Sequence, residues 1–237
     1  MNRRLLAVLI SATMILAACC SCETHDESIE IKETEATEET TTSETTAAEQ
    51  DRPMHNRYIT FGHYEQDGNE SNGPEPIEWK VISEEDGKVF LLSRYILDYQ
   101  PYNAEQTDIT WEDCSLRQWL NNDFLNAAFD ASEQEQILTV TNSNNDTTTA
   151  LRSTDGGNDT EDKIFLLSCD EADTLFSSDY ERAVGDCDWW WLRSPGRSSH
   201  HAAVVLTMGE VYHHGHLVSF NYHDHGVRPA LWLELET

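Results

Sequence analysis

The fold is decided by WWWLRSPG at residues 189–196 and GVRPALWLEL at residues 226–235. Both blocks combine tryptophan, leucine and proline with one arginine, a composition typical of a rigid and largely buried frame. The 29 residues between them, 197–225, are rich in His, Tyr and Ser and follow neither a strand period nor a helix period. We therefore interpret residues 197–225 as a contact surface that the frame presents.

The N-terminus has the pattern of an export signal. Arg3 and Arg4 precede an apolar run, residues 5–18, that is shorter than the roughly 20 residues of a membrane-spanning helix. The sequence LAAC at residues 16–19 resembles a bacterial lipoprotein signal, which implies a signal peptide over residues 1–18 and a lipid on the sulfur of Cys19. An ordinary secretory signal is the alternative. We expect an extracytoplasmic protein held at the membrane of the cell surface by this lipid.

Residues 19–56 are dominated by Glu and Thr. Eleven acids and a single base, Lys32, lie in residues 23–51, which supply about ten of the 29 net negative charges. A segment with so few large apolar residues cannot offset the entropy lost on ordering. The composition predicts a disordered, extended tether between the lipid and the domain.

Residues 57–237 have the length of one domain and hold all seven tryptophans. The domain is acidic, which argues against a nucleic-acid partner, because phosphate neutralisation requires Lys and Arg. Three of its residues are cysteines, Cys114, Cys169 and Cys187, so they cannot all pair within the domain. A disulfide between Cys169 and Cys187 is an open alternative.

Apolar and polar residues alternate over 58–62 and 77–82, as in half-buried strands, and the turn signal Asp86-Gly87 predicts a hairpin with residues 89–93. Helical spacing begins at Ser115, a candidate cap, and continues to residue 129. These elements together predict an α+β domain.

A second helix is expected over residues 132–140, where Ser132 and Glu135 fit a capping box. Residues 141–162 are expected to form a long loop, and residues 163–168 a strand. The acids of residues 155–162 offer oxygen ligands for Ca²⁺, but a solvated loop is the favoured interpretation.

Four blocks occur in a characteristic order: TWEDCSLRQWLNNDFLNAAF, DKIFLLS, WWWLRSPG and GVRPALWL. In this order they resemble a bacterial domain-of-unknown-function family of exported and lipid-anchored proteins. The resemblance implies a C-type-lectin-like fold, related to that of formylglycine-generating enzymes, with short helices and a small antiparallel sheet that the final strand closes. It also implies similarity to variable proteins that retroelements diversify by mutating adenines.

From this comparison we expect a structural frame and a ligand-binding face. The two arginines of the motifs should brace the frame by hydrogen bonds to backbone or acids. The frame comprises Trp190, Trp191, Arg193, Arg228 and Trp232. The face consists of short polar, Tyr and His side chains, as in paratopes: Ser198, Ser199, His200, His201, Tyr212, His213, His214, His216, Ser219, Asn221, Tyr222, His223, Asp224 and His225.

The composition of residues 197–225 is compatible with adenine mutagenesis. Mutation of Asn codons that end in C never produces Lys, Gln, Glu, Met or Trp. These five residue types occupy 28 of the 140 positions in residues 57–196, so about six would be expected in residues 197–225, and only Met208 and Glu210 occur. The depletion favours targeted diversification of the face.

Two other functions compete with ligand binding. His214, His216, His223 and His225 alternate along the sequence in pairs, so an extended strand would offer Zn²⁺ two imidazoles on one side. An enzyme on the formylglycine-generating fold is the other alternative, although no catalytic motif is present. We predict a non-enzymatic binding protein without a cofactor, whose partner is a surface protein or a glycan.

Overall fold

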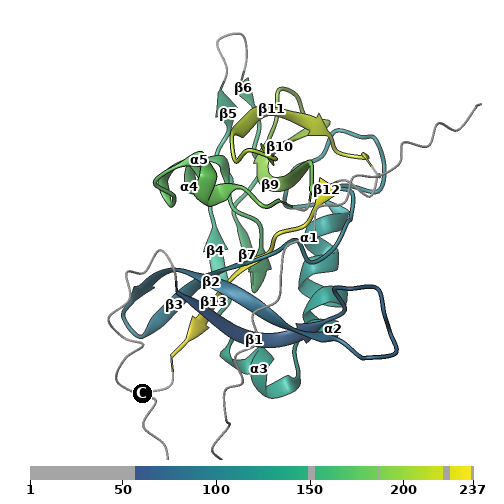
Figure 1. Ribbon diagram of the computed structural model, residues 1–237. Coiled ribbons are helices and arrows are strands. Elements are labelled where there is room, and N and C mark those ends of the chain that lie inside the picture. Colours follow the sequence, from purple (N-terminus) through teal and green to yellow (C-terminus); the bar gives the residue numbers. More distant parts are fainter. Residues whose placement is uncertain (1–56, 149–152, 186, 221–224, 236–237) are drawn as a thin grey trace, which may run out of the picture. The chain divides into compact units, whose positions relative to one another are not determined.

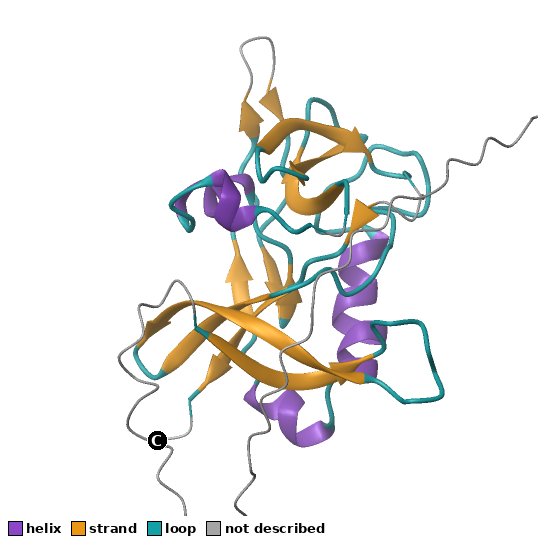
Figure 2. Ribbon diagram, viewed as in Figure 1, coloured by secondary structure: helices purple, strands orange, loops and turns teal. Residues whose placement is uncertain are grey.

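The computed structural model describes residues 57–148, 153–185, 187–220 and 225–235, all of which lie in one compact unit, Thr46–Thr237. The predicted signal peptide, lipidation site and tether lie outside the described residues. The described part is α+β, with mostly strands and a few short helices, which confirms the predicted class (Figures 1 and 2). No helix within it combines the length and hydropathy that a transmembrane helix requires.

An antiparallel five-stranded sheet contains both the first and the last strand of the domain. Its order is β1-β2-β3-β13-β8. Asp86 and Gly87 join β2 to β3 with positive φ angles of 49° and 76°, as a tight type I′ hairpin requires, so the predicted hairpin is confirmed. The strands are β1 (Tyr58–Tyr64), β2 (Glu75–Glu85), β3 (Lys88–Ser93), β8 (Ile164–Phe165) and β13 (Ala230–Glu234).

A four-stranded sheet is built from the WWWLRSPG block and the stretch that follows it. Its order is β11-β10-β9-β12, with β12 parallel to β9 and the other pairs antiparallel. The strands are β9 (Trp189–Pro195), β10 (His201–Leu206), β11 (Val211–Leu217) and β12 (His225–Gly226).

The long loop expected over residues 141–162 is more ordered than predicted. It contains two short antiparallel pairs, β4 (Val140–Asn142) with β7 (Thr160–Asp162), and β5 (Thr147–Thr148) with β6 (Ser153–Thr154). Asp162 explains part of this order, since its buried carboxylate pairs with Arg117 at 2.6 Å. It also accepts hydrogen bonds from Trp111 and Asn142.

The predicted first helix forms a continuous helical segment: α1 (Ser115–Trp119), the π-helical turn η2 (Leu120–Phe124) and α2 (Leu125–Ala128). Its N-cap is Cys114 rather than Ser115; the Cys114 sulfur accepts a hydrogen bond from the backbone N–H of Arg117 at 3.4 Å. The hydroxyl of Ser115 instead accepts a hydrogen bond from the backbone N–H of Ala104.

The predicted second helix is shorter and starts earlier than expected. α3 (Ala131–Gln136) is capped by Asp130, whose carboxylate accepts from the N–H of Glu133 while Glu133 accepts from the N–H of Asp130. The cap at Ser132 was therefore wrong. Two further helices follow, α4 (Cys169–Thr174) and α5 (Asp179–Arg182), and the strand expected over residues 163–168 is reduced to β8, because Ser168 caps α4.

The GVRP sequence crosses from one sheet to the other. Gly226 ends β12 beside β9, Val227 pairs with Asp98, and Ala230 begins β13 between β3 and β8. In Figure 1 this segment runs in yellow from β12 toward β13. The strand β13 is thus internal to the five-stranded sheet. Residues 226–235 therefore contribute to both sheets.

The core is apolar and aromatic, and it includes side chains from both sheets and from the helices. Trp79, Trp111, Trp190 and Trp191 are fully buried, whereas Trp232 is only half-buried and stacks on Phe90 with ring centroids 4.9 Å apart. Trp232 therefore contributes less to the frame than expected.

Two buried cysteines carry free thiols, Cys114 and Cys169, so Cys169 forms no disulfide with Cys187. Burial raises the pKa of each thiol to about 12, which suppresses the reactive thiolate. Neither thiol is placed for nucleophilic chemistry.

Candidate functional site

The floor of the candidate site is strand β9, whose three tryptophans alternate as a strand requires. Trp189 and Trp191 lie on one side, with ring centroids 4.5 Å apart and nearly perpendicular planes. Trp190 meets the guanidinium of Arg228, whose central carbon lies 5.1 Å from the ring centroid. All three rings are buried, so none of them forms an exposed platform for a sugar.

The two arginines of the motifs contact different partners. Arg193 forms a two-pronged ion pair with Glu171 of α4, with N–O distances of 2.5 and 2.9 Å, and also donates to the carbonyl of Leu166. Arg228 donates to the carbonyls of Ser93 and Arg182. Each guanidinium is buried and joins segments that are distant in the sequence, which is a bracing geometry.

The stretch 197–225 is not a surface throughout, because β10 carries core residues at Ala202–Val205. His201 is also buried, at 6% exposure, although it was predicted on the contact face. Its Nδ1 lies 2.7 Å from the hydroxyl of Ser198, and its Nε2 accepts from Arg197 at 3.2 Å. Burial, with Arg197 as the second cause, lowers the pKa of His201 to about 4. His201 therefore belongs to the interior as a neutral imidazole.

His225 is a second predicted face residue that the structure buries, at 6% exposure. Its ring stacks on Trp189 with centroids 4.0 Å apart and an interplanar angle of 13°. His216 also stacks on Trp189, at 4.6 Å, and is half-buried. Burial, and secondarily Arg197, lowers the pKa of His216. The indole of Trp189 thus contacts two imidazoles from different strands.

An irregularity in β11 separates the remaining histidines. The pairing of β10 with β11 shifts register between Ala202 and Val204, and Gly215 adopts φ +63°. A Cβ at position 215 would lie 2.0 Å from the carbonyl oxygen of Ala202, so only glycine fits here. Tyr212 has both His214 and His216 beside it, with ring centroids 5.6 and 5.8 Å away, but His214 is exposed, while His216 packs on Trp189.

A set of partly or fully exposed polar and aromatic side chains comes from the segment before β10, from β11 and from the segment after it. We call this set the contact surface. It comprises Ser198, Ser199, His200, Tyr212, His213, His214, His216 and Ser219. The predicted face residues Asn221, Tyr222, His223 and Asp224 lie outside the described residues.

Three residues that the sequence analysis did not identify border the contact surface. Asp108 accepts a hydrogen bond from Ser199 at 2.5 Å and lies 3.4 Å from His200, and these contacts lower its pKa. Gln106 accepts from Ser219 at 2.6 Å, and Asp173 lies 3.3 Å from His213. Ordinary polar residues in a loop and a helix carry no local signal of this role, which arises from contacts over 40 to 113 positions of sequence.

The described residues contain one group of three potential metal ligands, Glu65, Asp67 and Glu75, whose ligand atoms lie within 4.8 Å of one another. This group is remote in sequence from both predicted alternatives, the acids of residues 155–162 and the histidine cluster. The zinc hypothesis includes His223, outside the described residues, and it stays a prediction.

The fold and the surface define an α+β domain in which small antiparallel sheets bury an aromatic frame beneath exposed polar side chains. Residues 86–235 match the sequence model of the family described as Domain of unknown function (DUF6273), and the chain belongs to this family. Neither the curated proteins nor the solved structures include a match to the chain.

Proposed function

We propose that this chain is a lipid-anchored, extracytoplasmic binding protein with a C-type-lectin-like domain, and that its contact surface binds a surface protein or a glycan. The observation that carries the proposal is the separation of roles within one sheet. Strand β9 supplies buried tryptophans, while the segment before β10 and strand β11 supply partly or fully exposed Ser, Tyr and His side chains. Such side chains combine adaptable hydrogen bonds with amphipathic contact area.

The surroundings of the contact surface support recognition rather than catalysis. Asp108 and Gln106 hold Ser199 and Ser219 by side-chain hydrogen bonds, which fixes donors and acceptors before a ligand arrives. The thiols of Cys114 and Cys169 have raised pKa values, and neither contributes to the contact surface. Preorganised polar groups on a rigid sheet favour a binding role.

The position of Met208 and Glu210 supports diversification by adenine mutagenesis. Both lie in the turn between β10 and β11, at the opposite end of β10 from Ser198–His200. Gly209 between them is held close to the backbone of Asp179, because a Cβ there would lie 1.7 Å from its carbonyl oxygen. These two exceptions to the codon rule therefore fall on a structural turn. A near-copy of the coding stretch for residues 189–232 in neighbouring DNA would support this part of the proposal.

The binding proposal is tested with a double variant, His213→Ser and His214→Ser, which removes two exposed imidazoles without touching the frame. The full chain and the variant are applied to a glycan array and to intact bacterial and host cells. His63→Ser is the matched control, since His63 is an exposed histidine on β1 of the other sheet. We expect the double variant to lose the binding that the wild type and the control share. Equal binding by all three proteins would refute the contact surface.

A further inference from the structure

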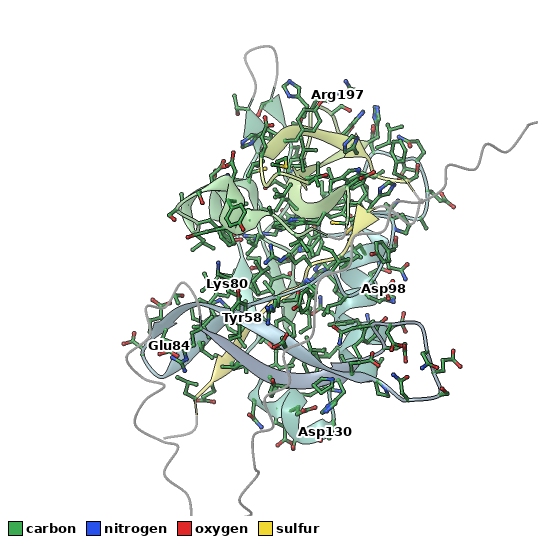
Figure 3. All side chains as sticks on the ribbon, in the orientation of Figure 1. Tyr58, Lys80, Glu84, Asp98, Asp130 and Arg197 are labelled. Carbon is green, nitrogen blue, oxygen red and sulfur yellow. The ribbon has the colours of Figure 1, made fainter. Side chains whose placement is uncertain are left out.

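A pocket of about 470 Å³ lies apart from the contact surface. Its volume is within the range of roughly 300–1,000 Å³ that small-molecule sites occupy. It is bordered by Tyr58 of β1, Lys80 of β2, the segment after β3, residues 180–181 and 183–185, and Arg228. Figure 3 labels Tyr58 and Lys80 at this place. No residue of the contact surface lines it.

The charged side chains of the pocket are mainly cationic, in a chain whose formal net charge is −29. Lys80, Arg94 and Arg228 line it, and among the described lining residues Glu181 is the one acid. Lys80 is 7% exposed and Arg228 is 3% exposed. Two buried cations, Lys80 and Arg228, therefore line the same pocket.

The other buried arginines show what is unusual about these two cations. Arg182 pairs with Asp179, and Arg193 pairs with Glu171. In the described part of the chain, by contrast, no carboxylate lies within ion-pairing distance of Lys80 or Arg228.

Part of the hydrogen-bonding capacity of both cations is unused. Arg228 donates from Nε and Nη1 to backbone carbonyls, but its Nη2 donates to none of the described residues. The Lys80 ammonium lies 5.1 Å from the ring centroid of Phe176 and likewise donates no hydrogen bond within the described residues. The nearby carboxylate of Glu181 already accepts two hydrogen bonds from Ser177. Within the described residues, Lys80 and Arg228 thus keep donors without an acceptor.

Burial of a charge without a partner is unfavourable by several kcal/mol per ion. In keeping with this, burial lowers the pKa of Lys80 and lowers that of Arg228 to about 10. A bound oxyanion would supply both the missing counter-charge and the missing acceptors, because carboxylate, phosphate and sulfate oxygens form short, charge-assisted hydrogen bonds with these donors.

The rim of the pocket is aromatic. Tyr58 and Tyr95 are each 39% exposed, and the guanidinium of Arg94 lies over both rings, 4.6 and 5.0 Å from their centroids. Arg94 is itself paired with Glu78 at 3.0 Å, so its charge is already balanced and it serves to hold the two rings. The rim thus offers ring edges and phenol hydroxyls beside the cationic floor.

We propose that this pocket binds a small organic anion. Its carboxylate, phosphate or sulfate group lies between Lys80 and Arg228, and its body contacts Tyr58 and Tyr95. The site is independent of the contact surface on β10 and β11, and binding there requires neither lipidation nor diversification of residues 197–225.

Calorimetry and thermal unfolding of the full chain test the proposal. The probes are glucuronate, glucose 6-phosphate and inorganic phosphate, each at roughly 10 mM, where a millimolar site is nearly filled. Glucose is the neutral control, and sodium chloride keeps ionic strength constant, since phosphate and sulfate stabilise proteins without binding. We expect saturable binding of glucuronate and glucose 6-phosphate, weaker binding of inorganic phosphate and no binding of glucose.

Lys80→Met removes the buried charge and keeps the chain length, and Lys88→Met is the matched control on the exposed side of β3. We expect Lys80→Met to weaken anion binding at least tenfold while the ligand-free variant unfolds at the same temperature as the wild type or higher. Lys88→Met should leave both quantities unchanged.

Three results would overturn the proposal. Absence of anion binding by the wild type, or equal binding by wild type and Lys80→Met, would show that the pocket holds no oxyanion at Lys80. A large loss of stability in ligand-free Lys80→Met would show that the ammonium is a structural group. Equal affinity for inorganic phosphate, glucuronate and glucose 6-phosphate would remove Tyr58 and Tyr95 from the binding site.

Discussion

Replacement of Trp191 by alanine should destabilise the domain far more than replacement of two histidines on the same sheet. Trp191 is 0% exposed, packs edge-on against Trp189 and donates from its indole nitrogen to the carbonyl of Gln100 at 3.0 Å. Truncation of a buried tryptophan costs about 3–5 kcal/mol. For a domain of this size, each kcal/mol lowers the Tm by about 2–4 °C, so we expect a loss of about 6–20 °C.

The comparison variant is His213→Ser with His214→Ser. Both imidazoles are exposed, and exposed substitutions stay within about 0.5 kcal/mol each. The expected total is about 1 kcal/mol, or roughly 2–4 °C in Tm. Thermal unfolding is followed by circular dichroism or calorimetry, and the Tm is compared rather than the amplitude of the signal, which changes when an indole is removed. A double variant that melts as early as Trp191→Ala would show that these histidines belong to the core, and the contact surface would have to be abandoned.

Three other predictions concern different parts of the chain. The folded-state pKa of His201 is lowered to about 4, so the unfolded chain binds a proton at this position more readily than the folded chain does. The stability that neutral His201 contributes is therefore present above about pH 6.5 and is lost as the pH falls toward 4. His201→Gln should flatten the Tm–pH profile in this window, and an unchanged slope would contradict the burial of a neutral His201. Palmitate labelling should disappear in Cys19→Ser, and persistence of the label would rule out lipidation at this position. Deletion of residues 23–50 should leave the Tm within a few degrees of the full chain, since a charged segment without apolar anchors adds little to a core; a larger loss would mean that it packs on the domain.

The sequence predicted those features that depend on neighbouring residues. The Asp86-Gly87 hairpin and the first helix are local in origin, and the three tryptophans of β9 alternate because every strand alternates. The start of α3 shows the limit of such signals. Asp130 and Glu133 fit a capping box as well as Ser132 and Glu135 do, and the pattern alone does not choose between them.

The features that could not be predicted depend on distant contacts. His201 and His225 have the composition of a contact face, but they are buried, since His201 pairs with Leu217 of β11 and His225 stacks on Trp189. The pocket of about 470 Å³ is lined by cations from positions 80, 94 and 228, each ordinary in its local sequence. The pairing of the strands brings these three positions to one pocket, and local sequence patterns do not reveal which strands pair.

The crossing of residues 226–229 between the two sheets sets the order in which the domain can be completed during synthesis. A chain that ends before residue 225 lacks the strand beside β9 and also the strand between β3 and β8, so neither sheet has its full set of neighbours. Because β13 is the neighbour of β3, the sheet formed by β1, β2 and β3 keeps an unpaired edge until residues 230–234 have been synthesised. We therefore expect a premature stop between residues 226 and 230 to yield an aggregating product rather than a smaller folded domain.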